Sequence, residues 1–171
     1  MNVVLKRVSA AALSCLLGLT LPPAHSSEGA PQPGHPWPSM TLQDQHGEPW
    51  SLLPETRRVL VAVSRQASNL ALAVLSSQPE GFLQARRVQY LADMSRMPGF
   101  ITRAVALPSL RAQPFRVGVV LEADRLAGWA LNPEQLTLFD LDEGKVTAVR
   151  SLPDEAALRE ALELATSSGT P

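Results

Sequence analysis

Short apolar runs alternate with helical patterns over most of the chain, beginning near residue 58. Residues 58–64 (RVLVAVS) form a β-branched run with the length of a buried strand. Because the run is apolar along its whole length, it predicts a strand in a sheet that is covered on both faces. Further strands are predicted at residues 87–92, 115–121, 136–141 and 146–150. The last two flank Asp142-Glu143-Gly144-Lys145, a turn sequence that predicts a hairpin.

The segments between these strands have helical patterns. After the first strand, Ser68 and Asn69 precede the helical run LALAVLSS, and we expect Ser68 to cap this helix. Residues 98–112 predict a second helix, with a bend or break at Pro108, and residues 125–129 predict a short helix or turn. The expected apolar side of the second helix consists of Phe100, Ile101, Ala104, Val105 and Leu107.

The chain is expected to end in an amphipathic helix. Ser151 and Asp154 are predicted to cap it together, and Gly169 is predicted to terminate it. Its expected apolar stripe consists of Leu158, Ala161, Leu162 and Ala165. Strands that alternate with helices and end in a hairpin and a final helix predict an α/β sandwich with a mixed sheet.

A shorter hairpin is predicted before the first central strand. Residues 40–42 and 50–52 flank a turn at residues 44–47, in which Gly47 can adopt the positive φ that such turns need. Pro49 lies in the second of these strands and has no N–H to donate. We therefore expect this strand at an edge of the sheet.

The first 26 residues have the layout of a secretory signal peptide. Lys6 and Arg7 precede an apolar run over residues 8–21, which is too short for a membrane span. Small residues at Ala24 and Ser26 predict cleavage after Ser26, and an uncleaved anchor is the alternative. Residues 27–38, rich in Pro, Gly and Ser, are expected to form an extended leader or tether. Residues 39–166 are expected to form one domain, and residues 167–171 a disordered tail.

Cys15 is the only cysteine in the sequence, and it lies within the predicted signal peptide. The exported chain would therefore form no disulfide and would depend on its hydrophobic core for stability. Cleavage also removes Lys6 and Arg7, so the formal net charge of −1 becomes more negative. This charge balance argues against a nucleic acid partner.

The order of the predicted elements resembles the thioredoxin-like superfamily, most closely its peroxiredoxin and copper-chaperone branch. Two short motifs carry the resemblance: L-x-D-x-x-G over residues 42–47 and D-x-D-x-G-K-V over residues 140–146. The resemblance covers nearly all of residues 37–165. It implies a three-layer sandwich with a mixed central sheet and an N-terminal β-hairpin.

The residues that would carry the redox chemistry of this superfamily are absent. Aligned without gaps, its reactive Cys-x-x-Cys falls on Ala67, Ser68, Asn69 and Leu70. The missing thiol also excludes a cysteine peroxidase. Pro133 resembles the proline beside the superfamily's active site, and an ordinary turn proline is an equal alternative. Since no histidine is expected near Ser68 to activate it, we predict no catalytic residue.

The sequence predicts no metal site and no bound cofactor. His35 and His46 alone do not make a metal site. The acidic turn of Asp140, Asp142 and Glu143 lacks the ligand pattern of a calcium loop. The chain also contains no G-x-G-x-x-G sequence and no phosphate loop.

An arginine-rich segment provides one small-ligand hypothesis. Residues 86–116 contain a single acid, Asp93, and arginines at positions 86, 87, 96, 103, 111 and 116, whereas residues 122–163 are acidic. If the middle helix is continuous, an anionic ligand would bind near Asp93, Ser95, Arg96, Arg103 and Arg111, where residues 95–99 would offer free N–H groups. The other interpretation is that the basic and acidic segments pair across the surface.

Met94 and Met97 follow a central strand, on the side of the sheet where α/β proteins place ligand crevices. We interpret them as core residues, with partner contacts as the alternative. Trp50 and Trp129 are interpreted in the same way.

These observations predict an exported, redox-inactive thioredoxin-like domain of the periplasm. We expect it to act as a binding or accessory protein for a partner in the cell envelope, without a stable membrane span. The alternative is an oxidoreductase with a non-thiol mechanism that uses a bound flavin or another anionic cofactor.

Overall fold

The computed structural model describes residues 30–164, which form a mixed seven-stranded sheet in the order β2-β1-β5-β4-β3-β6-β7. Its centre consists of parallel strands β3 (Arg58–Ala62), β4 (Val88–Asp93) and β5 (Val117–Val120). The antiparallel hairpin of β6 (Leu136–Asp142) and β7 (Lys145–Leu152) extends one side. The hairpin of β1 (Leu42–Asp44) and β2 (Pro49–Trp50) extends the other. The predicted α/β fold with a mixed sheet is confirmed.

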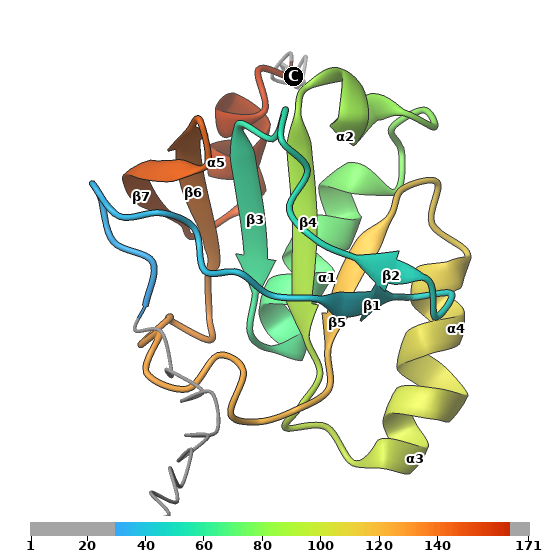
Figure 1. Ribbon diagram of the computed structural model, residues 1–171. Coiled ribbons are helices and arrows are strands. Elements are labelled where there is room, and N and C mark those ends of the chain that lie inside the picture. Colours follow the sequence, from blue (N-terminus) through green and yellow to red (C-terminus); the bar gives the residue numbers. More distant parts are fainter. Residues whose placement is uncertain (1–29, 165–171) are drawn as a thin grey trace, which may run out of the picture.

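Helices cover one face of this sheet. Figure 1 shows α1 (Arg65–Leu75) and α5 (Glu155–Ala161) behind the strands, where they pack against each other and against β3, β6 and β7. Phe82 of the short helix α2 (Phe82–Ala85) packs into the same core. The fully buried side chains of this core include Leu60, Val74, Leu75, Tyr90, Leu136, Leu138, Leu158 and Leu162. Their burial supplies the main stabilisation of the fold.

Irregular chain covers the opposite face. In front of the sheet in Figure 1, the leader runs across the strands, and Pro36 pairs with Lys145. The Gly34 N–H donates to the Val146 carbonyl at 2.8 Å. Trp37 and Trp129 meet with ring centroids 5.4 Å apart, and both pack edge-on against Phe139. Residues 30–38 therefore form a leader that is packed against the sheet instead of a free tether, because Trp37 anchors it in an apolar cluster.

Both predicted hairpins are confirmed. Gly47 has a φ of 89°, and β2, which contains Pro49, is the outermost strand of its side. In the second hairpin, Glu143 and Gly144 both have positive φ, 47° and 76°. Two successive positive φ values match the right-handed twist of the flanking strands.

The middle helix runs through Pro108 instead of breaking there. It consists of α3 (Gly99–Ile101), the π-helical turn η1 (Thr102–Ala106) and α4 (Leu107–Arg111), and it lies beside β5 and β1 in Figure 1. A wider π turn directly before Pro108 accommodates the proline ring and its missing N–H.

The predicted apolar side of this helix is wrong for Phe100, Ala104 and Val105, which are exposed, whereas Ile101 and Leu107 are partly buried. Phe100 and Val105 are 67% and 55% exposed, whereas Thr102 and Leu110 are buried. The extra residue of the π turn rotates the later part of the helix relative to the earlier part. The helix also packs only along the side of the sheet, so it buries a narrow stripe.

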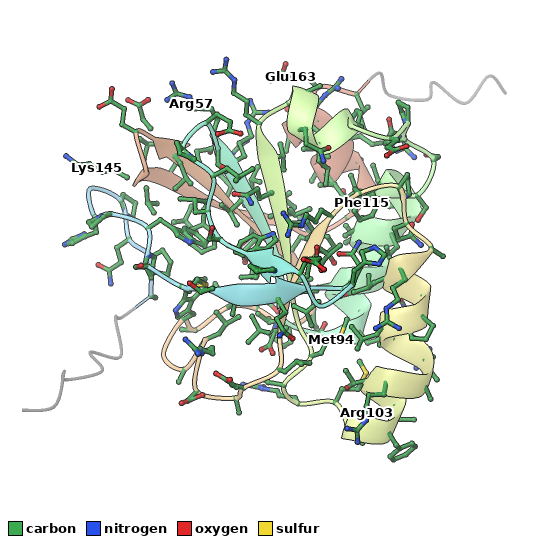
Figure 2. The ribbon with its side chains drawn as sticks, turned by 45° about the vertical axis from the view of Figure 1, so that its right-hand side comes forward. Arg57, Met94, Arg103, Phe115, Lys145 and Glu163 are labelled. Atoms are coloured by element: carbon green, nitrogen blue, oxygen red, sulfur yellow. The ribbon has the colours of Figure 1, made fainter. Side chains whose placement is uncertain are left out.

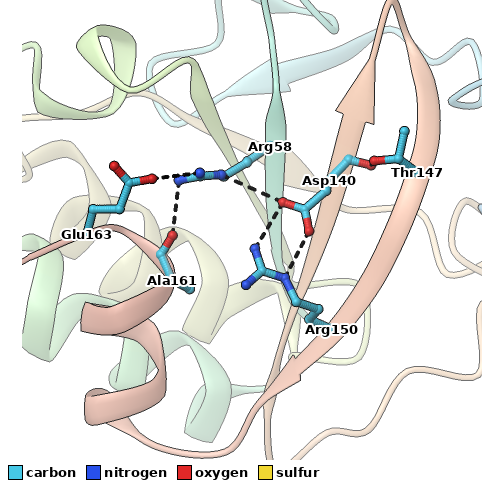
Figure 3. A network of polar contacts seen from close by, with 6 residues as sticks. All are labelled: Arg58, Asp140, Thr147, Arg150, Ala161 and Glu163. Atoms are coloured by element: carbon cyan, nitrogen blue, oxygen red, sulfur yellow. Dashed lines mark hydrogen bonds and ion pairs between the residues drawn. The ribbon is translucent and has the colours of Figure 1, made fainter.

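An ion-pair network ties the end of α5 to the sheet (Figure 3). The Arg58 guanidinium donates to the Ala161 carbonyl at 3.0 Å and to Glu163 at 2.9 Å, and it lies 3.7 Å from Asp140. Arg150 holds Asp140 with two parallel hydrogen bonds. Asp142 pairs with Arg57. Asp140 and Asp142 of the β6–β7 hairpin thus pair with arginines, and residues 30–164 contain no cluster of three metal-ligating side chains.

Asp154 alone caps α5. Its carboxylate accepts the Ala157 N–H at 2.8 Å, while Ser151 belongs to β7, so the predicted capping pair is wrong. The signal peptide and its cleavage site, the tail, Ala165 and Gly169 lie outside the described residues. Of the helices in residues 30–164, none has the length and apolar character needed to cross a membrane.

Candidate functional site

The junction between β3 and α1 is the position at which the resemblance placed redox chemistry. Ser64 is the N-cap of α1, and its hydroxyl accepts the Ala67 N–H at 3.0 Å. Ser68 is therefore not the cap, which corrects our prediction. Ala67, Ser68, Asn69 and Leu70 all lie inside α1, beyond its start. The first turn of α1 runs from the N-cap Ser64 to Ala67, so these two residues have the same spacing as the two cysteines of a Cys-x-x-Cys motif.

Pro133 lies against this first turn. The Ser64 hydroxyl donates to the Pro133 carbonyl, across a sequence separation of 69 residues. The peptide bond before Pro133 is trans, since residues 30–164 contain no cis peptide bond. The structure thus brings the predicted proline and the start of α1 together.

Within residues 30–164, neither Ser64 nor Ser68 has a hydrogen bond to a histidine or a carboxylate. The Ser68 hydroxyl faces the Tyr90 hydroxyl at 3.4 Å. Burial raises the pKa of Tyr90 to about 12, although the Ser68 contact opposes the shift, so the phenol stays protonated near neutral pH. The described histidines lie in the leader (His35) and in the β1–β2 turn (His46). This arrangement does not support nucleophilic catalysis.

A groove separates α1 from the middle helix. We call it the helix groove; it has a volume of about 130 Å³. The α1 side contributes mainly polar groups, and the other side contributes mainly apolar ones. Its lining consists of Ser64, Arg65, Ser68, Asn69, Leu72, Asp93, Met94, Met97, Ile101, Val105, Ala106, Ser109 and Leu110. Met94 is buried and confirms our interpretation, whereas Met97 is only partly buried. Figure 2 shows Met94 between the sheet and this helix.

A second hollow lies on the other side of Asp93. It has a volume of about 310 Å³ and is lined mainly by the loop after β5, including Trp129, together with Arg96 and Pro133. Trp129 is 4% exposed and Trp50 is 1% exposed, which confirms that both are packing residues. Asp93 therefore borders both hollows at the carboxyl end of a central strand, as expected for an α/β sheet.

The predicted anion site does not assemble. The Ser95 N–H donates to the Asp93 carboxylate at 2.8 Å, and the Met97 N–H donates to the Met94 carbonyl, so neither N–H is free for a ligand.

The arginines of the predicted site lie apart. Arg96 faces the second hollow, and Figure 2 places Arg103 near the lower end of the middle helix. Arg111 donates to the Gln45 carbonyl at 2.8 Å instead. These five residues do not converge on one ligand, so the flavin alternative has no support.

Two of the arginines hold the β1–β2 hairpin. Arg111 donates a hydrogen bond to the Gln45 carbonyl in the turn of this hairpin. The Arg116 guanidinium donates to the Asp44 carboxylate at 2.7 Å. The Gln45 side chain bonds the Phe115 carbonyl and the Val117 N–H, both at 2.8 Å. These arginines therefore have structural roles, although their partners differ from the predicted acidic segment.

Asp44 is expected to make stability depend on pH. Burial raises its pKa, but hydrogen bonds from Arg116 and from the Glu48 and His46 N–H groups outweigh burial and lower it overall. The carboxylate thus stabilises the fold fully above the unfolded-state pKa of about 4, and this contribution disappears as the pH falls through the folded-state pKa. Asp44→Asn should lower the free energy of unfolding at pH 7 by about 1–3 kcal/mol. Urea denaturation at pH 7 and pH 3 measures this, and an equal difference at both pH values would contradict it.

The sequence contained a signal for the true start of α1 that our prediction missed. The buried positions Ala67, Ala71, Val74 and Leu75 have helical spacing and begin before Ser68. A helix that includes Ala67 needs its cap three residues earlier, at Ser64. No comparable sequence signal predicts that Val105 is exposed at the helix groove, because its exposure depends on the π turn.

Comparisons with known proteins identify the fold. No protein-family model and no curated protein matches the chain. A putative thiol:disulfide interchange protein DsbE from Chlorobium tepidum aligns with a TM-score of 0.53 at 16% identity, over 78% of this chain and 94% of its own. A thiol:disulfide interchange protein from Bacteroides sp. aligns with a TM-score of 0.52 at 15% identity, over 81% and 95%. The chain therefore has the thioredoxin-like fold of the superfamily that its sequence resembles.

Proposed function

We propose that this protein is an exported, redox-inactive thioredoxin-like domain that acts as a binding or accessory protein in the cell envelope. One observation carries the proposal: the first turn of α1 holds Ser64 and Ala67 at the Cys-x-x-Cys spacing, and the only cysteine of the sequence is Cys15. Thiol–disulfide exchange needs a thiolate as attacking group. A domain without a thiolate cannot carry out this exchange, and we propose that it uses the fold for binding.

Export is supported by the pattern of the first 26 residues. A basic start, a short apolar run and small residues before Ser27 are typical of a cleaved secretory signal. The similar proteins from Chlorobium tepidum and Bacteroides sp. are described as thiol:disulfide interchange proteins. Disulfide chemistry belongs to oxidising compartments outside the bacterial cytoplasm, which agrees with this localisation.

Binding rather than structural packing is supported by the helix groove. Phe100 and Val105 are large apolar side chains on one short helix, and both are more than half exposed. Isolated exposed apolar residues are normal, but Val105 also lines a groove beside the position of the lost thiols.

Fractionation of cells that express the tagged full chain tests the proposal. We expect the protein in the periplasmic fraction, with Ser27 as its first residue by N-terminal sequencing. Gentle cross-linking followed by purification should recover an envelope protein in a fixed ratio. A protein that retains Met1 and stays in the cytoplasm, or one recovered without a partner, would contradict the proposal.

A further inference from the structure

We infer that the helix groove binds a peptide segment of the partner in which one large apolar side chain is followed by an acidic residue. This inference rests on the proposed function, because it names the kind of partner that the binding domain recognises. Three features of the helix groove support this inference: its apolar side, its rim and its charge.

The apolar side of the groove fits one side chain. Met94, Met97, Ile101 and Leu110 line it, and its volume of about 130 Å³ is close to that of an apolar cavity of about 150 Å³ that accepts a benzene-sized group. Methionine side chains adapt their shape to different apolar partners. A leucine, methionine or phenylalanine of the partner therefore fits, and a longer apolar surface does not.

The rim of the groove provides the second contact. Val105 is 55% exposed on this rim, so a partner that covers it removes apolar surface from water. Opposite to it, α1 presents the exposed amide of Asn69, which can bond a peptide backbone. The apolar anchor would thus enter between a hydrophobic and a polar wall.

The charge of the groove favours an acidic residue beside this anchor. Arg65 is the cation among the lining residues, it is exposed, and within residues 30–164 it has no ion-pair partner. The lining acid, Asp93, is only partly exposed, accepts the Ser95 N–H and also borders the second hollow, so the exposed Arg65 is the more accessible of the two charged groups. A carboxylate on the ligand would pair with Arg65, whereas a lysine would be repelled.

Titration of the isotope-labelled protein, purified from the periplasm, tests the inference by nuclear magnetic resonance. The probes are three short soluble peptides that are identical except at two adjacent positions, which hold leucine and glutamate, leucine and lysine, or serine and glutamate. We expect saturable shifts of the helix-groove amides with the leucine–glutamate peptide. The other two peptides should bind at least about fivefold more weakly.

Variants of the rim locate the binding. Arg65→Glu should weaken the leucine–glutamate peptide about tenfold and restore binding of the leucine–lysine peptide, because it reverses the charge. The variant should fold, since a carboxylate is favourable in the first turn of a helix. Val105→Ser should weaken binding several-fold, while Val149→Ser, at the 41% exposed Val149 of β7, should not.

Two results would overturn the inference. One is equal or absent binding of the three peptides, and the other is binding that is unchanged by Arg65→Glu and Val105→Ser. If the cross-linked partner is still recovered with these two variants, the proposed binding function stands and only its location in the helix groove is wrong. If no partner is recovered with the unaltered protein, the proposed function itself fails.

Discussion

The Ser64→Cys/Ala67→Cys variant is expected to catalyse thiol–disulfide exchange, and the unaltered protein is expected not to. Ser64 caps α1 and already accepts the Ala67 N–H, so a thiolate at this position would receive the same stabilisation from the helix N-terminus. A thiol pKa lowered by one unit from about 8.5 raises the thiolate fraction at neutral pH roughly tenfold. Reduction of insulin by dithiothreitol should therefore accelerate about tenfold over the uncatalysed reaction.

The Ser68→Cys/Ala71→Cys variant is the matched control. It makes the same substitutions one helical turn later, with Ser68 partly buried like Ser64 and Ala71 fully buried like Ala67. Inside the helix, the N–H groups are used by backbone hydrogen bonds and cannot stabilise a thiolate. Equal activity of the two variants would show that the start of α1 has no special reactivity. A folded but inactive Ser64→Cys/Ala67→Cys variant would show the same.

Trp50→Ala should destabilise the protein by about 3–5 kcal/mol, the largest stability effect that we expect. Trp50 is 1% exposed and covers the backbone of β5, where a Cβ added at Gly118 would lie 2.6 Å from the indole ring. The side chain thus joins the β1–β2 hairpin to the central sheet. Urea denaturation measures the loss directly. A loss below about 1 kcal/mol would contradict the packing that we describe.

Gly118→Ala tests the same contact from the other side. In the unaltered protein, it should lower the free energy of unfolding by about 1–3 kcal/mol, because the ring cannot move within a packed core. In the Trp50→Ala background, the added methyl group meets no ring, so its effect should nearly vanish. Additive effects of the two substitutions would contradict direct contact between them.

The sheet could be predicted from the sequence because its signals are local. The apolar run at residues 58–64 and the turn at Glu143 and Gly144 each determine one element without reference to distant residues. The order of these elements then determines the α/β architecture. Pro49 indicated an edge strand for the same reason. It has no N–H to donate to a neighbouring strand, and this is a property of the residue itself.

The errors occur where distant packing outweighs local pattern. The leader has the composition of a tether, but Trp37 packs into an apolar cluster that the strands of the sheet form together with Trp129. The middle helix has apolar residues on several sides, and contact with the sheet selects Thr102 and Leu110 as its buried stripe. A π turn changes the helical period, and the spacing of apolar residues in the sequence does not reveal such a turn.

The candidate site was predicted only in part. The absence of cysteine from residues 30–164 and the position of Pro133 beside α1 follow from the sequence and the resemblance. The gapless alignment placed the reactive position at Ala67 to Leu70, inside α1, whereas the helix itself begins after its N-cap Ser64. The arginines seemed to form one site because they are close in sequence, whereas Arg111 and Arg116 hold the β1–β2 hairpin.

The most direct test of a binding domain without redox function is the turnover of disulfides and peroxide by purified protein that begins at Ser27. We predict rates equal to those of buffer alone, both before and after treatment with a thiol-alkylating reagent. Disulfide or peroxide turnover that copurifies with the protein and persists after the alkylating treatment would contradict this account.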